Sequence, residues 1–320
     1  MKRTGWAIVG TSGFADSDAA PAIAATMSAR LIGAAGSTPQ KSREFQQRHH
    51  AERSYENLDE LRRDPEVEVV WVAGPNHLHA PAAVALARAG KHVLVEKPMA
   101  ISVAEAKTMV EAADAAGVQL RIGYHHRFRA AHARLRQIVA DGRLGKIGFF
   151  RIHLFVRYPG PPAPWRRAAD TSGGWAINDI GTHLIDLMLW MTGLPADVAG
   201  ARLTTQRFEV ETDDSVALLF SLGKSATGLL ETSTALGSPS SRIEIYGDAG
   251  WARADGTLGG SGVIETSYDG KTELKEEDPF AAQVAAMNDV IANRAAISAE
   301  GPIGVENVRL IQRARELALR

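Results

Sequence analysis

The sequence predicts an α/β protein with two domains: a doubly wound parallel sheet of the Rossmann type, then an α+β domain with an open, mainly antiparallel sheet. Two patterns predict this order. In the first third of the chain short apolar runs alternate with segments of helical period, and from about Lys146 longer stretches of alternating polarity take over. The 320 residues fit two domains, which we place at residues 1–123 and 124–320.

Five strands are expected in the first domain because five segments are short, apolar and rich in β-branched residues, as strands covered on both faces should be. They are residues 6–9, 31–35, 67–72, 93–96 and 119–122. Helices are expected at 80–89, before Gly90, and at 102–116, where Ser102 and Glu105 form a capping pattern and Gly117 ends the run.

The second domain is expected to contain an antiparallel sheet, because its alternating stretches are separated by turn residues such as Asp269-Gly270. The expected strands are residues 147–156, 199–208, 215–221, 226–234, 242–246 and 263–268. Helices are expected at 180–191, 280–292 and 305–319, and residues 158–164 are expected to form a loop. We expect the helices to lie on one face of this sheet.

Composition excludes several function classes. There is no cysteine, which rules out disulfides, thiolate metal sites and thiol nucleophiles. With 36 basic and 37 acidic residues, the chain offers no charged patch for a nucleic acid or a membrane surface. The apolar run at 6–9 is too short for a signal peptide, and the run at 184–191 is too short for a membrane span. We expect a cytoplasmic protein.

The first expected strand leads into a glycine-containing turn typical of dinucleotide-binding proteins. The segment is Gly10-Thr11-Ser12-Gly13-Phe14-Ala15, where the fingerprint is G-x-G-x-x-G/A. Gly10 would make the tight turn and the small Ala15 would let the helix approach the strand, while Ser12 stands at the second glycine. The alternative is a plain strand–turn–helix whose glycine only makes the turn.

The end of the second strand favours NADP(H) over NAD(H). An NAD site usually has an acidic residue there, but this chain has Gly36-Ser37-Thr38. The hydroxyls of Ser37 and Thr38, with Lys41 and Arg43 just beyond, would suit a 2′-phosphate. The alternative is that Lys41 and Arg43 belong to the solvated face of the next helix.

Three further motifs carry a family resemblance. They are Gly74-Pro75-Asn76-His77-Leu78-His79, Glu96-Lys97-Pro98 and Asp179-Ile180-Gly181-Thr182-His183. In this order they resemble the glucose-fructose oxidoreductase, inositol dehydrogenase and rhizopine-catabolism family, abbreviated Gfo/Idh/MocA. Within it the chain looks nearest to sugar reductases such as anhydrofructose reductase, because Ser12, Ser37-Thr38 and Trp165-Arg166 recur in that branch.

The resemblance implies an N-terminal Rossmann domain, a C-terminal α+β domain whose sheet builds homodimers or homotetramers, and an active site between the two. It also assigns residues at the ends of the third and fourth expected strands to cofactor binding. These are Gly74, Pro75, Asn76, His79, Glu96 and Lys97.

Lys97, Asp179 and His183 are the expected catalytic residues. Reversible hydride transfer to a carbonyl needs a group that gives and takes the hydroxyl proton, and histidine titrates near neutrality. Asp179 lies four residues before His183, on the same face of a helix, where it can orient the imidazole or hold substrate. The Lys97 ammonium can stabilise a developing alkoxide. Which of Lys97 and His183 transfers the proton stays open.

Substrate contacts are expected from Trp165, which can pack on a sugar ring, from Arg166, which can bind sugar hydroxyls, and from His125. Trp175 either narrows the pocket or belongs to the core, and Asp186 either binds substrate or faces its neighbours. Histidines are plentiful, but hydride transfer needs no metal, so we expect none. The histidines and their possible partners in such a shell are His77, His79, His125, His126, Asp179 and His183.

The leading hypothesis is therefore an NAD(P)-dependent oxidoreductase acting on a sugar, polyol or related carbonyl compound. One alternative is a glycosidase of the same family that uses tightly held NAD. Another is a nucleotide-sensing regulator on the same fold. The presence of both Lys97 and His183 speaks against the regulator, because a sensor needs no proton-transfer groups.

Overall fold

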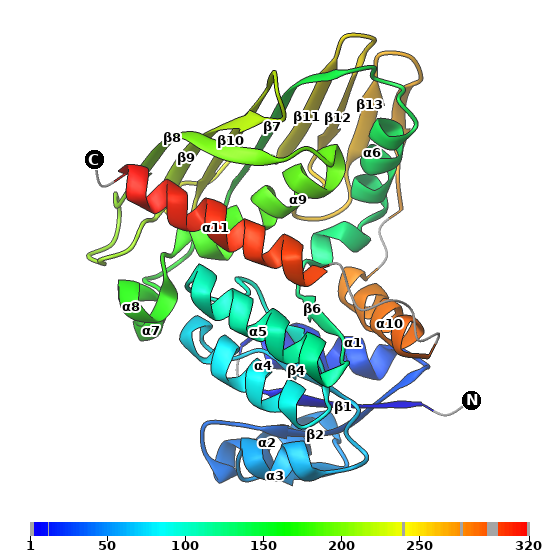
Figure 1. Cartoon of the computed structure of the whole chain (residues 1–320), viewed down its shortest axis with the longest axis vertical. Coiled ribbons are helices and arrows are strands. Elements are labelled where there is room, and N and C mark those ends of the chain that lie inside the picture. Colours follow the sequence, from blue (N-terminus) through cyan, green and yellow to red (C-terminus); the bar gives the residue numbers. More distant parts are fainter. Residues whose placement is uncertain (1–2, 12, 239–240, 276–277, 293–299, 319–320) are drawn as a thin grey trace. The chain divides into compact units, whose positions relative to one another are not determined.

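The computed structural model describes residues 3–11, 13–238, 241–275, 278–292 and 300–318. It divides into two compact units, shown in Figure 1. The first unit is Met1–His125 with Asp278–Val305, and the second is His126–Glu277 with Glu306–Arg320.

The first unit contains a six-stranded parallel sheet in the order β3-β2-β1-β4-β5-β6. The strands are β1 (Thr4–Val9), β2 (Ala29–Ala35), β3 (Arg53–Tyr55), β4 (Val69–Val72), β5 (His92–Val95) and β6 (Leu120–Ile122). All five expected strands are confirmed. The sequence missed β3, which has three residues and two polar side chains. The strand order reverses between β1 and β4, the place where such sheets bind nucleotides beyond their carboxyl ends.

Helices connect these strands and cover the sheet (Figure 1). They are α1 (Ala20–Ala25), α2 (Pro39–His49), α3 (Leu58–Arg63), α4 (His79–Arg88) and α5 (Val103–Ala116), with short helical turns η1 (Ala15–Ala19) and η2 (Asn76–Leu78). The expected caps of α5 are confirmed: the Ser102 hydroxyl accepts from the Glu105 N–H at 3.3 Å, and Gly117 ends the helix with φ +65°. Thr38 caps α2 in the same way, accepting from the Lys41 N–H.

Helix α10 (Pro279–Ala292) belongs to the first unit, although the expected boundary at residue 124 assigned it to the second. Val284 and Met287 are fully buried in the core cluster that contains Trp6. The indole N–H of Trp6 donates to Asn288 at 2.9 Å. About 150 residues of the second unit separate α10 from the rest of the first unit. Local sequence patterns do not reveal that the chain then returns to the first core.

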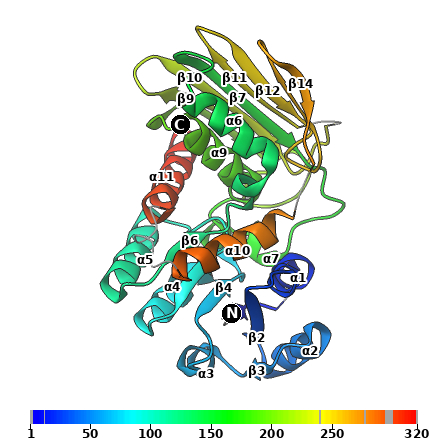
Figure 2. The same cartoon turned by 90° about the vertical axis from the view of Figure 1, so that its right-hand side faces the viewer.

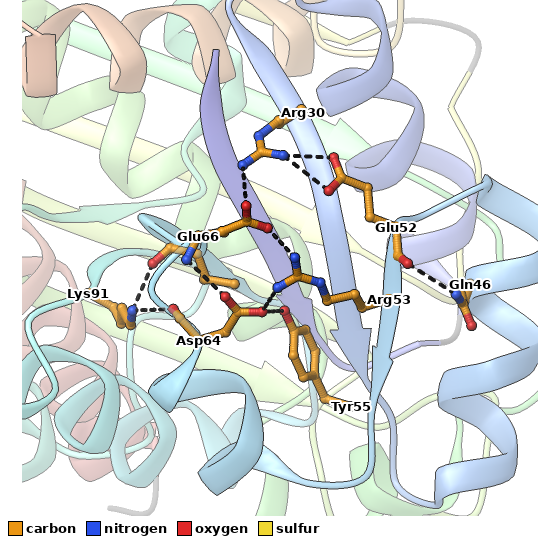
Figure 3. Close-up of polar contacts among 9 residues, drawn as sticks. Arg30, Gln46, Glu52, Arg53, Tyr55, Asp64, Glu66 and Lys91 are labelled. Atoms are coloured by element: carbon orange, nitrogen blue, oxygen red, sulfur yellow. Dashed lines mark hydrogen bonds and ion pairs between the residues drawn. The ribbon is translucent and has the colours of Figure 1, made fainter. Parts of the chain in front are cut away.

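The amino ends of the parallel strands are joined by charged side chains (Figure 3). Arg53 at the start of β3 pairs with Asp64 and Glu66, which precede β4. Arg30 in β2 pairs with Glu52 and Glu66, and Lys91 donates to the backbone carbonyls of Asp64 and Val67. These contacts cross-link the amino edge of the sheet.

The second unit contains an eight-stranded sheet in the order β14-β13-β12-β11-β7-β10-β9-β8. Neighbouring strands are antiparallel except β7 and β10, which run parallel. The strands are β7 (Ile147–Phe155), β8 (Ala196–Thr204), β9 (Ser215–Leu222), β10 (Ala226–Ser233), β11 (Arg242–Gly247), β12 (Trp251–Asp255), β13 (Val263–Thr266) and β14 (Gly270–Glu273). The expected fold class is confirmed; β12 and the fully exposed β14 were missed.

Helices cover one face of this sheet, as expected (Figure 2). They are α6 (Ala130–Ala140), which the sequence missed, α9 (Thr182–Thr192) and α11 (Glu300–Ala318). Leu135, Leu184 and Leu310 from the three helices lie in one core cluster with alternate residues of the strands. Along β9, Val216, Leu218 and Phe220 are buried, whereas Leu219 on the other face is 44% exposed.

Short segments precede α9 and carry several expected site residues. They are η3 (His125–Phe128), α7 (Pro164–Arg167), α8 (Ala169–Ser172) and the π-helical turn η4 (Ile177–Gly181). The expected strand 199–208 ends earlier, at Thr204. In the described part of the chain, no helix is both long enough and apolar enough to cross a bilayer.

Candidate active site

The turn after β1 has the form that a bound dinucleotide needs. Gly10 has φ +98°, and a Cβ there would lie 2.9 Å from the carbonyl carbon and oxygen of Ala73 after β4, so only glycine fits. Gly13 has φ +51° and no heavy atom within 4 Å of its Cβ position, and the same open space surrounds Gly74. Ser12 lies outside the described residues. These two glycines leave room for a pyrophosphate at the switch point of the sheet.

Residues 14 and 15 have structural roles in this turn. Ala15 is fully buried and begins the π-helical turn η1. The ring of Phe14 packs edge-on against Trp71 and Phe280, with centroids 5.6 and 5.4 Å away. The Phe14 side chain, expected among the cofactor-binding residues, therefore lies among core aromatic rings.

The loop between β2 and α2 brings Ser37, Thr38 and Lys41 together. The Lys41 ammonium donates to the Ser37 hydroxyl at 3.2 Å, and Lys41 follows the cap residue Thr38 in the first turn of α2. Arg43 lies on the exposed surface of the same helix. A cation, a hydroxyl and a helix N-terminus suit a phosphate group.

The loops after β4 and β5 are held to each other by His79. Its ring is 1% exposed; Nδ1 lies 2.8 Å from the Pro98 carbonyl oxygen and Nε2 lies 2.9 Å from that of Gly74. Asn76 is also buried, within η2. His79 was expected to contact the cofactor; in the structure its ring is buried and both ring nitrogens face backbone carbonyls.

Glu96 anchors the peptide of Lys97 at the end of β5. One carboxylate oxygen accepts from the Trp71 indole N–H at 3.0 Å, and the other accepts from the Lys97 N–H at 3.3 Å. A side chain at Gly123 would collide with this carboxylate, since its Cβ would lie 2.5 Å from Oε1. Burial raises the pKa of Glu96 to about 7. Lys97 itself leaves the carboxyl edge of the sheet.

In the second unit, Asp179 and His183 lie on one continuous helical segment, with Asp179 in η4 and His183 in the first turn of α9. The Tyr158 hydroxyl donates to Asp179 at 2.9 Å, and the Arg166 guanidinium approaches the same carboxylate at 3.7 Å. Burial and the Asp179 charge raise the pKa of Tyr158. The sequence predicted only that Tyr158 lies in a loop. Its contact with Asp179 spans 21 residues and leaves no periodic signal in the sequence.

Asp213 fixes the start of this segment and was also missed. Its carboxylate accepts from the backbone N–H of Trp175 at 3.2 Å and of Ile177 at 2.7 Å, so it caps η4 from a distant loop. Burial raises the pKa of Asp213 to about 6. Trp175 is 1% exposed and packs against the rings of Tyr158 and Phe208, which favours the core interpretation of this residue.

The Trp165-Arg166 pair is organised as a stack. The Arg166 guanidinium lies over the Trp165 ring, 4.4 Å from its centroid, while the same guanidinium faces Asp179. The structure therefore brings Arg166 and Asp179 together, both expected to bind substrate. His125, in the first unit, stacks on Phe280 with ring centroids 4.2 Å apart.

Two neighbours of His183 complete this region. The His126 ring meets the His183 ring edge-on, with centroids 4.7 Å apart, and its Nδ1 accepts from Arg129 at 3.2 Å. Asp186, one turn after His183, forms a buried two-point ion pair with Arg127, whose Nε donates to Oδ2 at 2.9 Å. The sequence left open whether Asp186 binds substrate or faces its neighbours; in the structure its carboxylate faces Arg127.

Comparison with known proteins identifies the class of this fold and site. Residues 4–124 match a family described as "Oxidoreductase family, NAD-binding Rossmann fold". Residues 132–253 match the "GFO/IDH/MocA C-terminal domain". The chain belongs to the Gfo/Idh/MocA oxidoreductase family, as the three motifs predicted.

Among curated proteins, the chain is similar to 1,5-anhydro-D-fructose reductase of Ensifer adhaerens, with 34% identity over 183 residues, 57% of this chain and 55% of that protein. It is also 34% identical to scyllo-inositol 2-dehydrogenase (NADP(+)) of Bacillus subtilis over 167 residues, 52% of this chain and 46% of that protein. These matches span about half the length of the relatives. A crystal structure of aldose-aldose oxidoreductase from Caulobacter crescentus with glycerol superposes with a TM-score of 0.90 at 27% identity, covering 99% and 98% of the two chains.

Proposed function

We propose that this protein is an oxidoreductase that transfers hydride between a nicotinamide cofactor and a sugar, polyol or related carbonyl compound. One observation carries the proposal. Lys97 follows β5 at the carboxyl edge of a dinucleotide-type sheet, and Glu96 accepts a hydrogen bond from its peptide N–H. The same chain carries Asp179 and His183 on one helical segment. The names of the similar proteins, a sugar reductase and an inositol dehydrogenase, support this substrate class.

The bound cofactor would supply or accept the hydride. Gly10 would make the tight turn, and Gly13 and Gly74 would leave space for its pyrophosphate. Lys97 and His183 are proposed to act at the reacting carbon, where one donates the proton to the oxygen and the other stabilises the charge that develops there. Asp179 orients the imidazole or holds a substrate hydroxyl, while Tyr158 and Arg166 hold Asp179.

NADP(H) is the favoured cofactor. The loop after β2 has no carboxylate at Gly36-Ser37-Thr38 to bind ribose hydroxyls or repel a phosphate, and Lys41 already donates to Ser37 there. Similarity to an NADP(+)-dependent inositol dehydrogenase supports this choice.

The open face of the second sheet is proposed to form a homodimer or homotetramer. Leu219 and Tyr246 on this sheet are 44% and 41% exposed, and a second copy of the chain packed on this face would cover them. Sedimentation of wild type and Leu219→Lys would test it; equal monomer masses for both contradict the proposal.

The function is tested in two steps. Thermal shifts with NAD(H) and NADP(H) identify the cofactor, because a ligand that binds only the folded state raises Tm. A panel of sugars, polyols and ketoses is then assayed with that cofactor. We expect Lys97→Met and His183→Ala each to lower turnover roughly 100-fold or more, and His183→Ala to leave cofactor binding intact. Lys107→Met, an exposed lysine on α5, is the matched control. Full turnover by either site variant contradicts the assignment.

A further inference from the structure

His79 makes an unusual pair of contacts for a buried histidine. Both ring nitrogens face backbone carbonyl oxygens, at 2.8 Å for Pro98 and 2.9 Å for Gly74, and the residue is 1% exposed. A carbonyl only accepts hydrogen bonds, so every bond in this arrangement must come from a ring N–H. His79 can thus donate to either of two fixed acceptors on different loops, and to both at once only when the ring is protonated.

The two acceptors lie at chemically significant positions. Pro98 directly follows Lys97 after β5, and Gly74 opens the loop after β4 that contains Asn76. His79 is the first residue of α4, so the ring stands on a regular helix. One side chain at the start of a regular helix therefore contacts both the loop that contains Lys97 and the loop after β4, where the strand order of the sheet reverses.

The protonation of the ring decides how many of these bonds exist at once. Burial lowers the pKa of His79, the charges of Lys97 and His77 act in the same direction, and the two carbonyls oppose them. A neutral ring carries one N–H and donates to one carbonyl at a time. Removing the ring would leave the buried Pro98 carbonyl and the partly exposed Gly74 carbonyl without this donor.

We propose that His79 is a positioning residue that holds the Pro98 carbonyl, and with it Lys97, in register with the loop that begins at Gly74. The part concerning Lys97 rests on the proposed function. His79 acts through Lys97 and the loop, since its own ring nitrogens are both directed at the backbone.

Two conservative variants separate the two contacts. An asparagine amide reaches the position of Nδ1, the nitrogen facing Pro98, whereas a glutamine amide reaches that of Nε2, facing Gly74. We expect His79→Gln to lower kcat at least 10-fold and to shift the pH profile of kcat, with the cofactor Kd within threefold of wild type. His79→Asn should lower kcat less than His79→Gln does and should weaken cofactor binding. Equal kcat values for the two variants would overturn the proposal.

A measurement without turnover keeps this test separate from that of the proposed function. In wild type labelled with ¹⁵N-histidine, a ring N–H held by a buried carbonyl exchanges slowly with solvent, and His79→Leu, checked for folding by circular dichroism, identifies its signal. We expect one slowly exchanging ring N–H to disappear in His79→Leu. If no such signal is lost, the bridge is absent, whatever the enzyme activity. If wild type turns over no substrate, the proposed function fails while this signal still decides the bridge.

Discussion

The Tyr158 hydroxyl donates to Oδ2 of Asp179 at 2.9 Å, and Arg166 approaches Oδ1 of the same carboxylate at 3.7 Å. Each oxygen of Asp179 therefore has a partner from the chain that follows β7: Tyr158 lies in the loop and Arg166 in α7. The backbone carbonyl of Tyr158 accepts in turn from Arg207 at 2.6 Å, which ties this segment to the loop after β8. The position of the Asp179 carboxylate therefore depends on residues that are distant in sequence from both Asp179 and α9.

Tyr158→Phe should lower kcat/KM roughly 10-fold or more, because a hydrogen bond to a charged group contributes about 1.5–3 kcal/mol. Folding should be little affected, since the phenyl ring still packs against Trp175. Steady-state kinetics and thermal melts check this. Tyr268→Phe, which alters a tyrosine 37% exposed at the surface, is the control. Unchanged kinetics in Tyr158→Phe would show that Asp179 needs no such support.

Lys41→Ala should weaken NADP(H) binding by about 10-fold or more and change NAD(H) binding little, because a lost charge-assisted bond to phosphate costs about 1.5–3 kcal/mol. Dissociation constants from cofactor fluorescence titration measure both. Lys107→Ala is the matched control, an exposed lysine on α5 with no assigned role in cofactor binding. Equal losses for both cofactors would place Lys41 outside the 2′-phosphate site.

Asp186→Ala should destabilise the second unit by about 3–5 kcal/mol, because it leaves the buried Arg127 guanidinium without its counter-charge. The double variant Arg127→Met with Asp186→Leu should recover most of this loss, since apolar side chains can replace a buried ion pair. Urea unfolding followed by circular dichroism gives the free energies. A double variant as unstable as Asp186→Ala would contradict this account.

Glu96→Gln should make the protein less sensitive to pH. The pKa of Glu96 is about 7 in the folded protein against an ordinary value of 4.5. The folded state thus favours the protonated carboxyl: its stabilising contribution is complete below pH 4.5 and is lost as pH rises through 7. A shift of this size corresponds to about 3 kcal/mol.

Glutamine keeps an acceptor for the Trp71 N–H and does not ionise. The free energy of unfolding of Glu96→Gln relative to wild type should therefore increase by up to about 3 kcal/mol between pH 4.5 and 8. Urea titrations at several pH values measure this difference, with Glu111→Gln on the exposed surface of α5 as the control. A difference independent of pH would mean that Glu96 ionises in the folded protein as it does in the unfolded chain.

Local signals in the sequence were sufficient for much of the fold. Short apolar runs rich in β-branched residues predicted five of the six strands of the first sheet, the Ser102 and Gly117 pattern predicted both ends of α5, and the ordered motifs around Lys97 and His183 predicted the family. Short polar elements were missed: β3 has two polar residues of three, and β14 is exposed along its whole length. Such strands form because a neighbouring strand supplies hydrogen bonds, which composition does not record.

What the sequence by itself determined is the chemistry available at each strand end and helix start, because spacing and residue type act within a few residues. Tertiary structure alone decided which distant groups support that chemistry: Tyr158 on Asp179, Asp213 at the start of η4, Arg127 on Asp186 and the two carbonyls at His79. It also decided that α10 completes the first core through Val284 and Met287. These contacts join segments from 5 to more than 200 residues apart, and a buried polar group takes whichever partner the packed chain brings to it.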